Sequence, residues 1–269
     1  MPLPRATLLG VPWDASSSFQ RGAAAAPPLI RQALWSGSSN TWNERGDDVS
    51  RPEVLEDAGD LVLPADPAAA RGLIESRIAA LASSGRAGLA LGGDHSVTYP
   101  ILRGRRGEAA PTVLHFDAHS DLYDEFEGDR HSHACPFARV MEEGLASRLV
   151  QVGVRCMTAH LRSQVERFGV EVYPAGRWRE VLPVVAALGG PVYVSLDLDV
   201  LEPMLAPGIS HPEPGGLSVR DVLDVLAALN APVVGADVVE YNPANDVRDL
   251  TARVAAKFVK ELVGVMRER

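Results

Sequence analysis

Short apolar runs rich in Val, Leu and Ala recur along the chain and alternate with longer Ala-, Leu- and Arg-rich segments. Several of these runs are apolar throughout, which is typical of parallel strands covered on both faces. The alternation predicts a three-layer α/β/α sandwich around a mostly parallel sheet of about eight strands. We expect the strands at 6–11, 54–63, 87–92, 112–117, 149–154, 170–173, 192–197 and 233–238.

Helical patterns fill the segments between the expected strands. Ser218 and Asp221 have the spacing of a capping box, with Asp in place of Glu, which indicates a helix start. The chain shows no internal repeat and no interdomain linker, so residues 1–269 are expected to form a single domain. We expect helices at 27–34, 67–83, 99–103, 137–143, 158–168, 179–188, 218–229 and 249–267.

Composition excludes several classes of protein. Of the 269 residues, 46% are hydrophobic, which is too many for a disordered chain. No apolar stretch reaches the roughly 20 residues that span a bilayer, so we expect no membrane association. A net charge of −9 disfavours a nucleic-acid partner, because phosphate binding needs a basic face. The start of the chain lacks an export signal, and Cys135 and Cys156 are read as thiols without chemistry, so we expect a cytoplasmic location.

The strongest chemical signal directly follows the apolar run 113–116. There the sequence reads Asp117-Ala118-His119-Ser120-Asp121. In an extended chain alternate side chains share a face, so Asp117, His119 and Asp121 can converge on one point at the end of a strand. Ligands of open α/β sheets bind at these carboxyl ends of strands.

Two further expected strands end in the same way. Asp197 and Asp199 follow one strand with the same two-residue spacing, and His95 follows another after a Gly-Gly pair. Four carboxylates and two imidazoles thus gather at three strand ends. One such motif alone is usually a loop start or a helix cap, but burying several uncompensated carboxylates together is costly. The set predicts two divalent ions, and oxygen-rich ligation with some imidazole favours manganese over zinc.

These motifs resemble the signatures of the ureohydrolase family, which contains arginase, agmatinase, formimidoylglutamase and the guanidinobutyrate and guanidinopropionate hydrolases. The similar segments are G-G-D-H-S at 92–96, D-A-H-S-D at 117–121 and S-L-D-L-D-V-L-E-P at 195–203. G-V-P-W-D at 10–14 and the segment 236–243 are similar as well, so the resemblance covers nearly the whole chain. It implies an arginase-like fold and a homo-oligomer, either a trimer or a hexamer.

The resemblance also implies two Mn²⁺ ions per subunit. It places His95 and Asp121 on one ion, His119 and Asp199 on the other, and Asp117 and Asp197 as bridges between them. A hydroxide between the ions would attack the guanidinium carbon of a small substrate and release urea and an amine.

Histidines and one glutamate complete the implied site. His133 resembles the family's loop histidine, which would give a proton to the leaving amine, and His131 is the alternative. Glu240 resembles a carboxylate that pairs with the substrate guanidinium, for which its geometry is suited. His211 departs from the expected pattern and either binds the substrate's tail or is exposed. His115 lies one step deeper in the strand than Asp117, and we expect it to support the ligands or pack in the core rather than to bind metal.

The loop 122–133 suggests a substrate. Its acids are Asp124, Glu125, Glu127 and Asp129, against one Arg130. If they line the entrance, they favour a cationic tail, which predicts hydrolysis of agmatine to putrescine and urea, as in prokaryotic agmatinases and polyamine biosynthesis; alternatively, they are solvated. Arginine, guanidinobutyrate, guanidinopropionate and formiminoglutamate are the alternative substrates. A non-catalytic metal-binding or regulatory protein is the alternative of another class.

Overall fold

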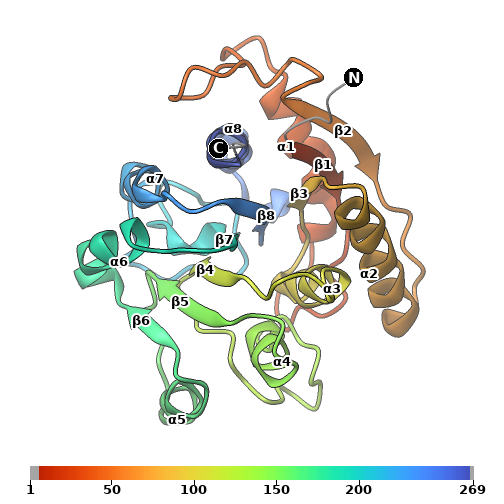
Figure 1. Ribbon diagram of the computed structural model, residues 1–269. Helices are drawn as coiled ribbons and strands as arrows, with labels where there is room; N and C mark the ends of the chain where they lie inside the picture. The colour runs from red at the N-terminus through yellow and green to blue at the C-terminus, as the bar shows by residue number, and fades with distance from the viewer. Residues whose placement is uncertain (1–5, 267–269) are drawn as a thin grey trace.

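The protein folds around one parallel sheet, as a computed structural model that describes residues 6–266 shows (Figure 1). The strand order across the sheet is β2-β1-β3-β8-β7-β4-β5-β6. The eight-stranded α/β/α sandwich with a mostly parallel sheet that the sequence predicts is confirmed. The strands are β1 Ala6–Gly10, β2 Leu55–Asp60, β3 Ala87–Leu91, β4 Thr112–Phe116, β5 Arg148–Val152, β6 Glu171–Tyr173, β7 Val192–Asp197 and β8 Val233–Val239.

Helices cover both faces of the sheet, with α1, α6, α7 and α8 on one face and α2 to α5 on the other (Figure 1). The helices are α1 Ala26–Leu34, α2 Pro67–Ser83, α3 Thr98–Gly104, α4 Pro136–Glu142, α5 Ala159–Phe168, α6 Leu182–Ala186, α7 Val219–Ala228 and α8 Leu250–Val265. The helix expected at 179–188 is instead a 3-10 helix, Ala175–Val181, followed by α6. Pro183 lies in the first turn of α6, where its fixed φ favours a new helix start. The last residue of the helix expected at 249–267 lies outside the described residues.

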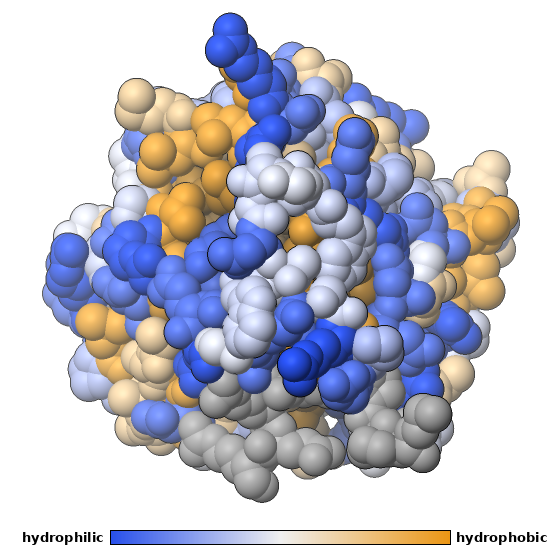
Figure 2. All heavy atoms as spheres, turned by 90° about the horizontal axis from the view of Figure 1, so that it is seen from above, coloured by the Kyte–Doolittle hydropathy of each residue, from blue (hydrophilic) through white to orange (hydrophobic). Residues whose placement is uncertain are grey.

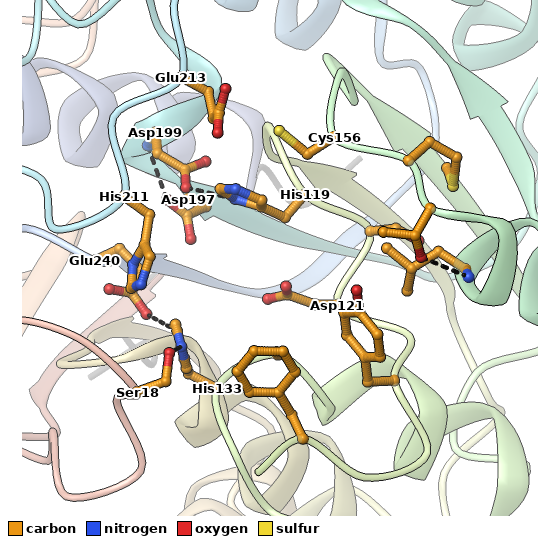
Figure 3. Close-up of a pocket in the computed structure, with 17 residues that line it drawn as sticks. Ser18, His119, Asp121, His133, Cys156, Asp197, Asp199, His211, Glu213 and Glu240 are labelled. Atoms are coloured by element: carbon orange, nitrogen blue, oxygen red, sulfur yellow. Dashed lines mark hydrogen bonds and ion pairs between the residues drawn. The ribbon is translucent and has the colours of Figure 1, made fainter.

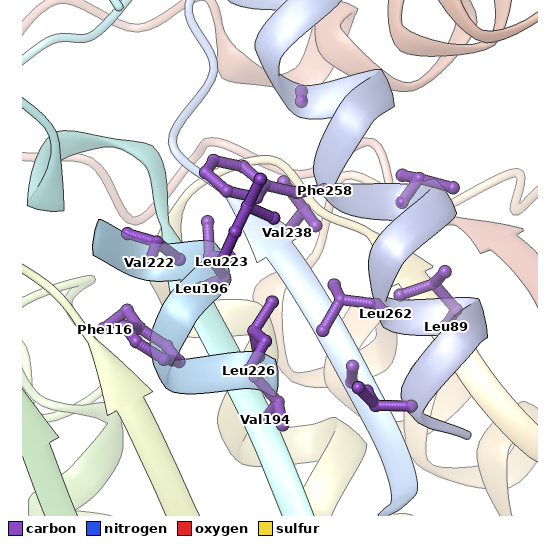
Figure 4. Close-up of a cluster of buried hydrophobic side chains, with 14 of the residues drawn as sticks. Leu89, Phe116, Val194, Leu196, Val222, Leu223, Leu226, Val238, Phe258 and Leu262 are labelled. Atoms are coloured by element: carbon purple, nitrogen blue, oxygen red, sulfur yellow. The ribbon is translucent and has the colours of Figure 1, made fainter. Parts of the chain in front are cut away.

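Two apolar layers hold the helices to the sheet. On one face, strand residues such as Leu196 and Val238 pack against α7 and α8 through side chains such as Leu226 and Phe258 (Figure 4). On the other face, alternate strand residues pack against α2 to α5. In β4, for example, Val113 belongs to the second layer and the next residue to the first. Burial on both faces explains why the strand sequences are apolar without alternation.

The capping box predicted at the start of α7 is present. The Ser218 hydroxyl accepts a hydrogen bond from the Asp221 backbone N–H at 3.1 Å, and the Asp221 carboxylate accepts one from the Ser218 N–H at 2.9 Å. These bonds satisfy backbone donors that the first turn of a helix leaves unpaired. They fix the point where the loop 201–217 ends.

The face of the molecule seen from the top of Figure 1 mixes hydrophilic and hydrophobic residues, with the hydrophobic ones in separate patches (Figure 2). Among residues 6–266, no helix combines the length and the apolar character that a bilayer crossing requires. Large exposed apolar side chains include Phe19, Trp42 and Met204, which come from three different loops.

The four central strands place the candidate site. β3, β8, β7 and β4 are neighbours in the sheet, and all run in the same direction. Their carboxyl ends therefore meet at one edge of the sheet. His95, Glu240, Asp197 and Asp117 lie at or just beyond these four ends.

Candidate active site and metal centre

His95 faces three carboxylates across a buried space. Its Nδ1 lies 3.1 Å from one oxygen each of Asp117, Asp121 and Asp197. The ring is fully buried, and Nδ1 makes no hydrogen bond of acceptable geometry. Buried polar atoms are normally satisfied, so this nitrogen and the oxygens around it form a ligand set suited to a cation.

His119 makes a second set beside the first. Its Nδ1 lies 2.9 Å from Asp199 Oδ2 and 3.4 Å from Asp117 Oδ1. Asp117 thus presents Oδ2 to His95 and Oδ1 to His119, which is the geometry of a bridging carboxylate. Asp197 presents Oδ2 to His95, while its Oδ1 accepts the Asp199 N–H at 2.8 Å. The structure therefore brings all six predicted ligands together.

The charges of this cluster require a cation. Burial raises the pKa of Asp197 well above its ordinary value, and the nearby carboxylates of Asp199 and Asp117 raise it further. Burial and then Asp117 raise the pKa of Asp199 to about 6. Carboxylates gathered around one buried space repel one another, and positive charge between them relieves this repulsion. Oxygen donors with two imidazoles fit divalent ions such as Mn²⁺, so the residues present are suited to hold manganese.

Residues behind the ligands fix their orientation. His115 Nε2 lies 2.8 Å from Asp117 Oδ2, and Gln151 Nε2 donates to His115 Nδ1 at 3.1 Å. Because Nδ1 is an acceptor, Nε2 carries the proton and donates to Asp117, which is the supporting arrangement expected for His115.

Ser195 and Asp237 support His95, and sequence reasoning missed both. Ser195 Oγ lies 2.9 Å from His95 Nε2 and donates to Asp237 at 2.7 Å. Both are single polar residues inside apolar strands. Ser195 stands two residues before Asp197, so the same alternation that identified the ligands could have found it.

His133 lies in one wall of the pocket between Glu240 and Ser18 (Figure 3). Its Nδ1 is 3.2 Å from Glu240 Oε1, and its Nε2 is 2.9 Å from Ser18 Oγ. Burial disfavours the charged ring, but the hydrogen bond and the charge of Glu240 outweigh it and raise the pKa of His133 to about 9. His133 is therefore protonated at neutral pH.

Two pocket carboxylates have left-handed backbone conformations. The φ angles of Asp121 and Glu240 are 48° and 65°, a region that residues other than glycine seldom adopt. The Glu240 N–H donates to Gly93 O at 2.8 Å, and a side chain at Gly93 would meet Trp13 O at 1.7 Å. Close backbone contacts thus hold Glu240 in its unusual conformation, as is common at functional sites.

The pocket itself is a cavity of about 380 Å³, and four of the six predicted ligands line it: His119, Asp121, Asp197 and Asp199. His211 lines it, with ring centroids 4.8 Å from His133 and 5.9 Å from Phe19. His131 does not line it and instead stacks on Tyr99 at 5.6 Å. Of the two histidines considered for proton transfer, His133 is the one that faces the pocket.

The acids of the loop 122–133 do not line this cavity. The loop contributes Tyr123, Phe126 and His133 instead. Asp124 pairs with His160 at 3.0 Å, and Asp129 accepts the His131 N–H at 2.7 Å. The electrostatic argument for a cationic substrate tail therefore loses its physical basis.

Arg155 ties the loops of the pocket together, and sequence reasoning missed it too. Its guanidinium donates to the backbone carbonyls of Asp199 at 2.7 Å and of Glu213 at 2.6 Å. It also reaches the carbonyls of Gly153, Val200 and Leu201. Its own N–H donates to Ala118 O at 2.8 Å. The side chain and backbone of this one residue thus join the ends of β4, β5 and β7 to the loop that carries His211.

Comparison with known proteins agrees with this geometry. The model of the arginase family matches residues 4–264. The chain belongs to the arginase family. Arginase 1, mitochondrial, of Arabidopsis thaliana is 46% identical over 273 residues, covering 95% of this chain and 79% of that protein. The solved arginase of Medicago truncatula superposes with a TM-score of 0.93 at 43% identity, covering 98% of this chain and 88% of that one.

Two expectations are corrected by these comparisons. The predicted preference for agmatine, with putrescine and polyamine biosynthesis, is wrong, because relatives that match nearly the full length are named arginases. The fold alone does not decide between substrates. A hypothetical agmatinase from Burkholderia thailandensis superposes with a TM-score of 0.88 at 29% identity over 98% of this chain and 86% of that one. The expected cytoplasmic location is wrong on the same comparison, since plant relatives are named mitochondrial or chloroplastic.

Proposed function

We propose that this hydrolase of the arginase family cleaves the guanidino group of arginine, with water, to ornithine and urea. The observation that carries the proposal is the similarity to proteins named arginases over 95–97% of the chain. The cavity adds support, because none of the four acids of the loop 122–133 lines it.

We propose that the six ligands hold two Mn²⁺ ions. His95 and Asp121 would hold one ion, His119 and Asp199 the other, with Asp117 and Asp197 between them. The opposed oxygens of Asp117 support its bridging role. When bound, the two ions supply the Lewis acidity that lowers the pKa of water toward neutrality.

Glu240 and His133 would act on the substrate. Glu240 Oε1 accepts hydrogen bonds from the His95 N–H and from His133, so Oε2 remains for the guanidinium. After water adds to the guanidinium carbon, the C–N bond to the amine breaks and the amine needs a proton. His133, with its pKa raised to about 9, holds one at Nε2 beside Ser18.

The test is urea release by the Mn-loaded protein from arginine, agmatine, 4-guanidinobutyrate and 3-guanidinopropionate in parallel. We expect kcat/KM for arginine to exceed the others by at least about tenfold, or 1.4 kcal/mol, with ornithine as the second product. A matched His133→Gln variant should lose turnover and keep its manganese. A higher kcat/KM for another compound would contradict arginine as the substrate. Loss of manganese in His133→Gln would contradict the proposal that His133 transfers a proton and does not hold the metal.

We also propose that the protein acts as a homo-oligomer, a trimer or a hexamer, on a small-molecule substrate. The family resemblance supports the assembly, and the net charge of −9 disfavours a nucleic-acid partner.

A further inference from the structure

Cys156 is a pocket residue to which the proposed function gives no role. Its thiol lies beside the His119 ring, and the carboxylate of Glu213 completes a group of three. One ligand atom from each residue lies within 4.8 Å of the other two. We propose that His119, Cys156 and Glu213 form a second metal site, selective for a thiophilic divalent ion such as Zn²⁺ or Cd²⁺.

The three side chains come from different loops that the fold holds in place. Both the Arg155 and the Cys156 N–H donate to Ala118 O, next to His119, at 2.8 and 3.2 Å. The Arg155 guanidinium holds the carbonyl of Glu213 from the other side. Figure 3 shows the sulfur of Cys156 and the carboxylate of Glu213 near His119, away from His133. The site is thus organised by the backbone before any ion binds.

The donor set differs in kind from the manganese ligands. A thiolate is a soft donor and an imidazole a borderline one, and this pair together with a carboxylate suits zinc and cadmium, whereas the six proposed manganese ligands include no sulfur. Within residues 6–266, the Glu213 carboxylate receives no hydrogen bond or ion pair, so it is available as a ligand. When the ion binds, a sulfur–metal bond replaces the S–H bond and the proton leaves to solvent.

His119 belongs to both sites, which has a consequence for loading. An ion held by His119, Cys156 and Glu213 competes with manganese for the ring of His119, whose Nδ1 faces Asp199 and Asp117. The two sites therefore exclude each other, and a thiophilic ion acts as an inhibitor that manganese displaces. This inference does not depend on which guanidino compound is hydrolysed.

The first experiment titrates Cd²⁺ into metal-free protein and follows the ultraviolet charge-transfer absorption of a cadmium–thiolate bond. The protein has two cysteines, so Cys135→Ser is a matched control for Cys156→Ser. Cys135 is fully buried and lies away from the group of three. We expect the absorption in the wild type and in Cys135→Ser, and its loss in Cys156→Ser. No absorption in the wild type, or the same absorption in Cys156→Ser, would overturn the site.

The second experiment tests the other two ligands with the same signal. Glu213→Gln should weaken cadmium binding by at least about tenfold. Excess Mn²⁺ should abolish the absorption by taking His119. Unchanged affinity in Glu213→Gln would reduce the site to a single thiol, and a signal that resists manganese would overturn the shared ligand. Both readouts are spectroscopic, so a failure of the arginine proposal would leave them interpretable.

Discussion

At the scale of single residues, the proton affinity of His133 depends on one neighbour. Glu240 accepts its Nδ1–H and faces it with a buried negative charge. Asp121 and Asp94 raise the pKa further but stand after Glu240 as causes. Glu240, which the sequence analysis expects to bind the substrate guanidinium, thus also keeps a proton on His133, the acid of the proposed reaction.

Replacing Glu240 should change this proton affinity. In Glu240→Gln the pKa of His133 should fall from about 9, because burial continues to disfavour the charged ring while its main partner is gone. A pKa raised by folding stabilises the native state below about 6.5, and that contribution is lost as the pH rises toward 9. The variant should therefore be less stable at pH 6 and lose less stability between pH 6.5 and 9.

The measurement is a proton NMR titration of the His133 ring in the metal-free protein, together with thermal unfolding across the same pH range. Glu213→Gln is the matched control, because Glu213 lines the same pocket and is not among the charges that shift His133. An unchanged His133 pKa in Glu240→Gln would show that Glu240 is not the cause.

The metal ligands could be predicted from the sequence because alternation within a strand is a local property. Asp117 and Asp121 share a face by backbone geometry alone, whatever surrounds them. The partners of Cys156 could not be predicted, because they come from loops whose approach depends on the whole fold. Cys156 was therefore interpreted as an inert thiol, and the structure places it beside His119.

At the scale of elements, the strand assignments agree because burial on both faces leaves a plain mark in the sequence. The observed helix boundaries differ from the expected ones where a proline or a turn sets the start of the helix, as at α6. The course of the loops was the part that sequence patterns predicted least well. Loop 122–133 is acidic in sequence, yet its backbone turns those acids out of the cavity and leaves Tyr123 and Phe126 inside.

Arg155 offers a test of how the loops are held. A lysine in its place keeps the charge but has one ammonium instead of a planar fork, so it cannot reach carbonyls in several loops at once. Arg155→Lys should lower the free energy of unfolding by about 1–3 kcal/mol, because buried carbonyls lose their donors. It should also weaken manganese binding, because the Asp199 backbone is released.

Chemical denaturation and equilibrium dialysis with Mn²⁺ measure the two effects. Arg162→Lys is the control, because Arg162 is exposed on α5 and does not bind the carbonyls that Arg155 holds. If Arg155→Lys matches Arg162→Lys in both measurements, the hydrogen bonds of the Arg155 guanidinium do not position the site.

At the scale of the whole molecule, the buried carboxylate of Asp197 opposes folding until a cation is present. Burial raises its pKa well above the ordinary value, so this carboxyl binds more protons in the folded metal-free state than in the unfolded one. The contribution of Asp197 to the stability of the metal-free protein should therefore fall as the pH rises above about 4. A bound ion reverses this by stabilising the native state alone.

Asp197→Asn should separate these effects. The metal-free variant should unfold at a higher temperature than the metal-free wild type at pH 8, since a repelled carboxylate is gone. Added Mn²⁺ should raise its unfolding temperature by less than it raises that of the wild type, because one metal ligand has been removed. Thermal unfolding with and without Mn²⁺ measures both, with Asp224→Asn on the exposed face of α7 as control. A metal-free variant less stable than the wild type would contradict the electrostatic argument.

The strand order has a consequence for synthesis on the ribosome. β8 lies between β3 and β7, yet it follows the other seven described strands in the sequence. Before Val233 has emerged, the sheet consists of two separate parts, β2-β1-β3 and β7-β4-β5-β6. His95 belongs to the first part and its carboxylate partners to the second. A nascent chain therefore cannot assemble the proposed metal centre until β8 has been made, and we expect manganese to bind only a chain whose two sheet parts have joined.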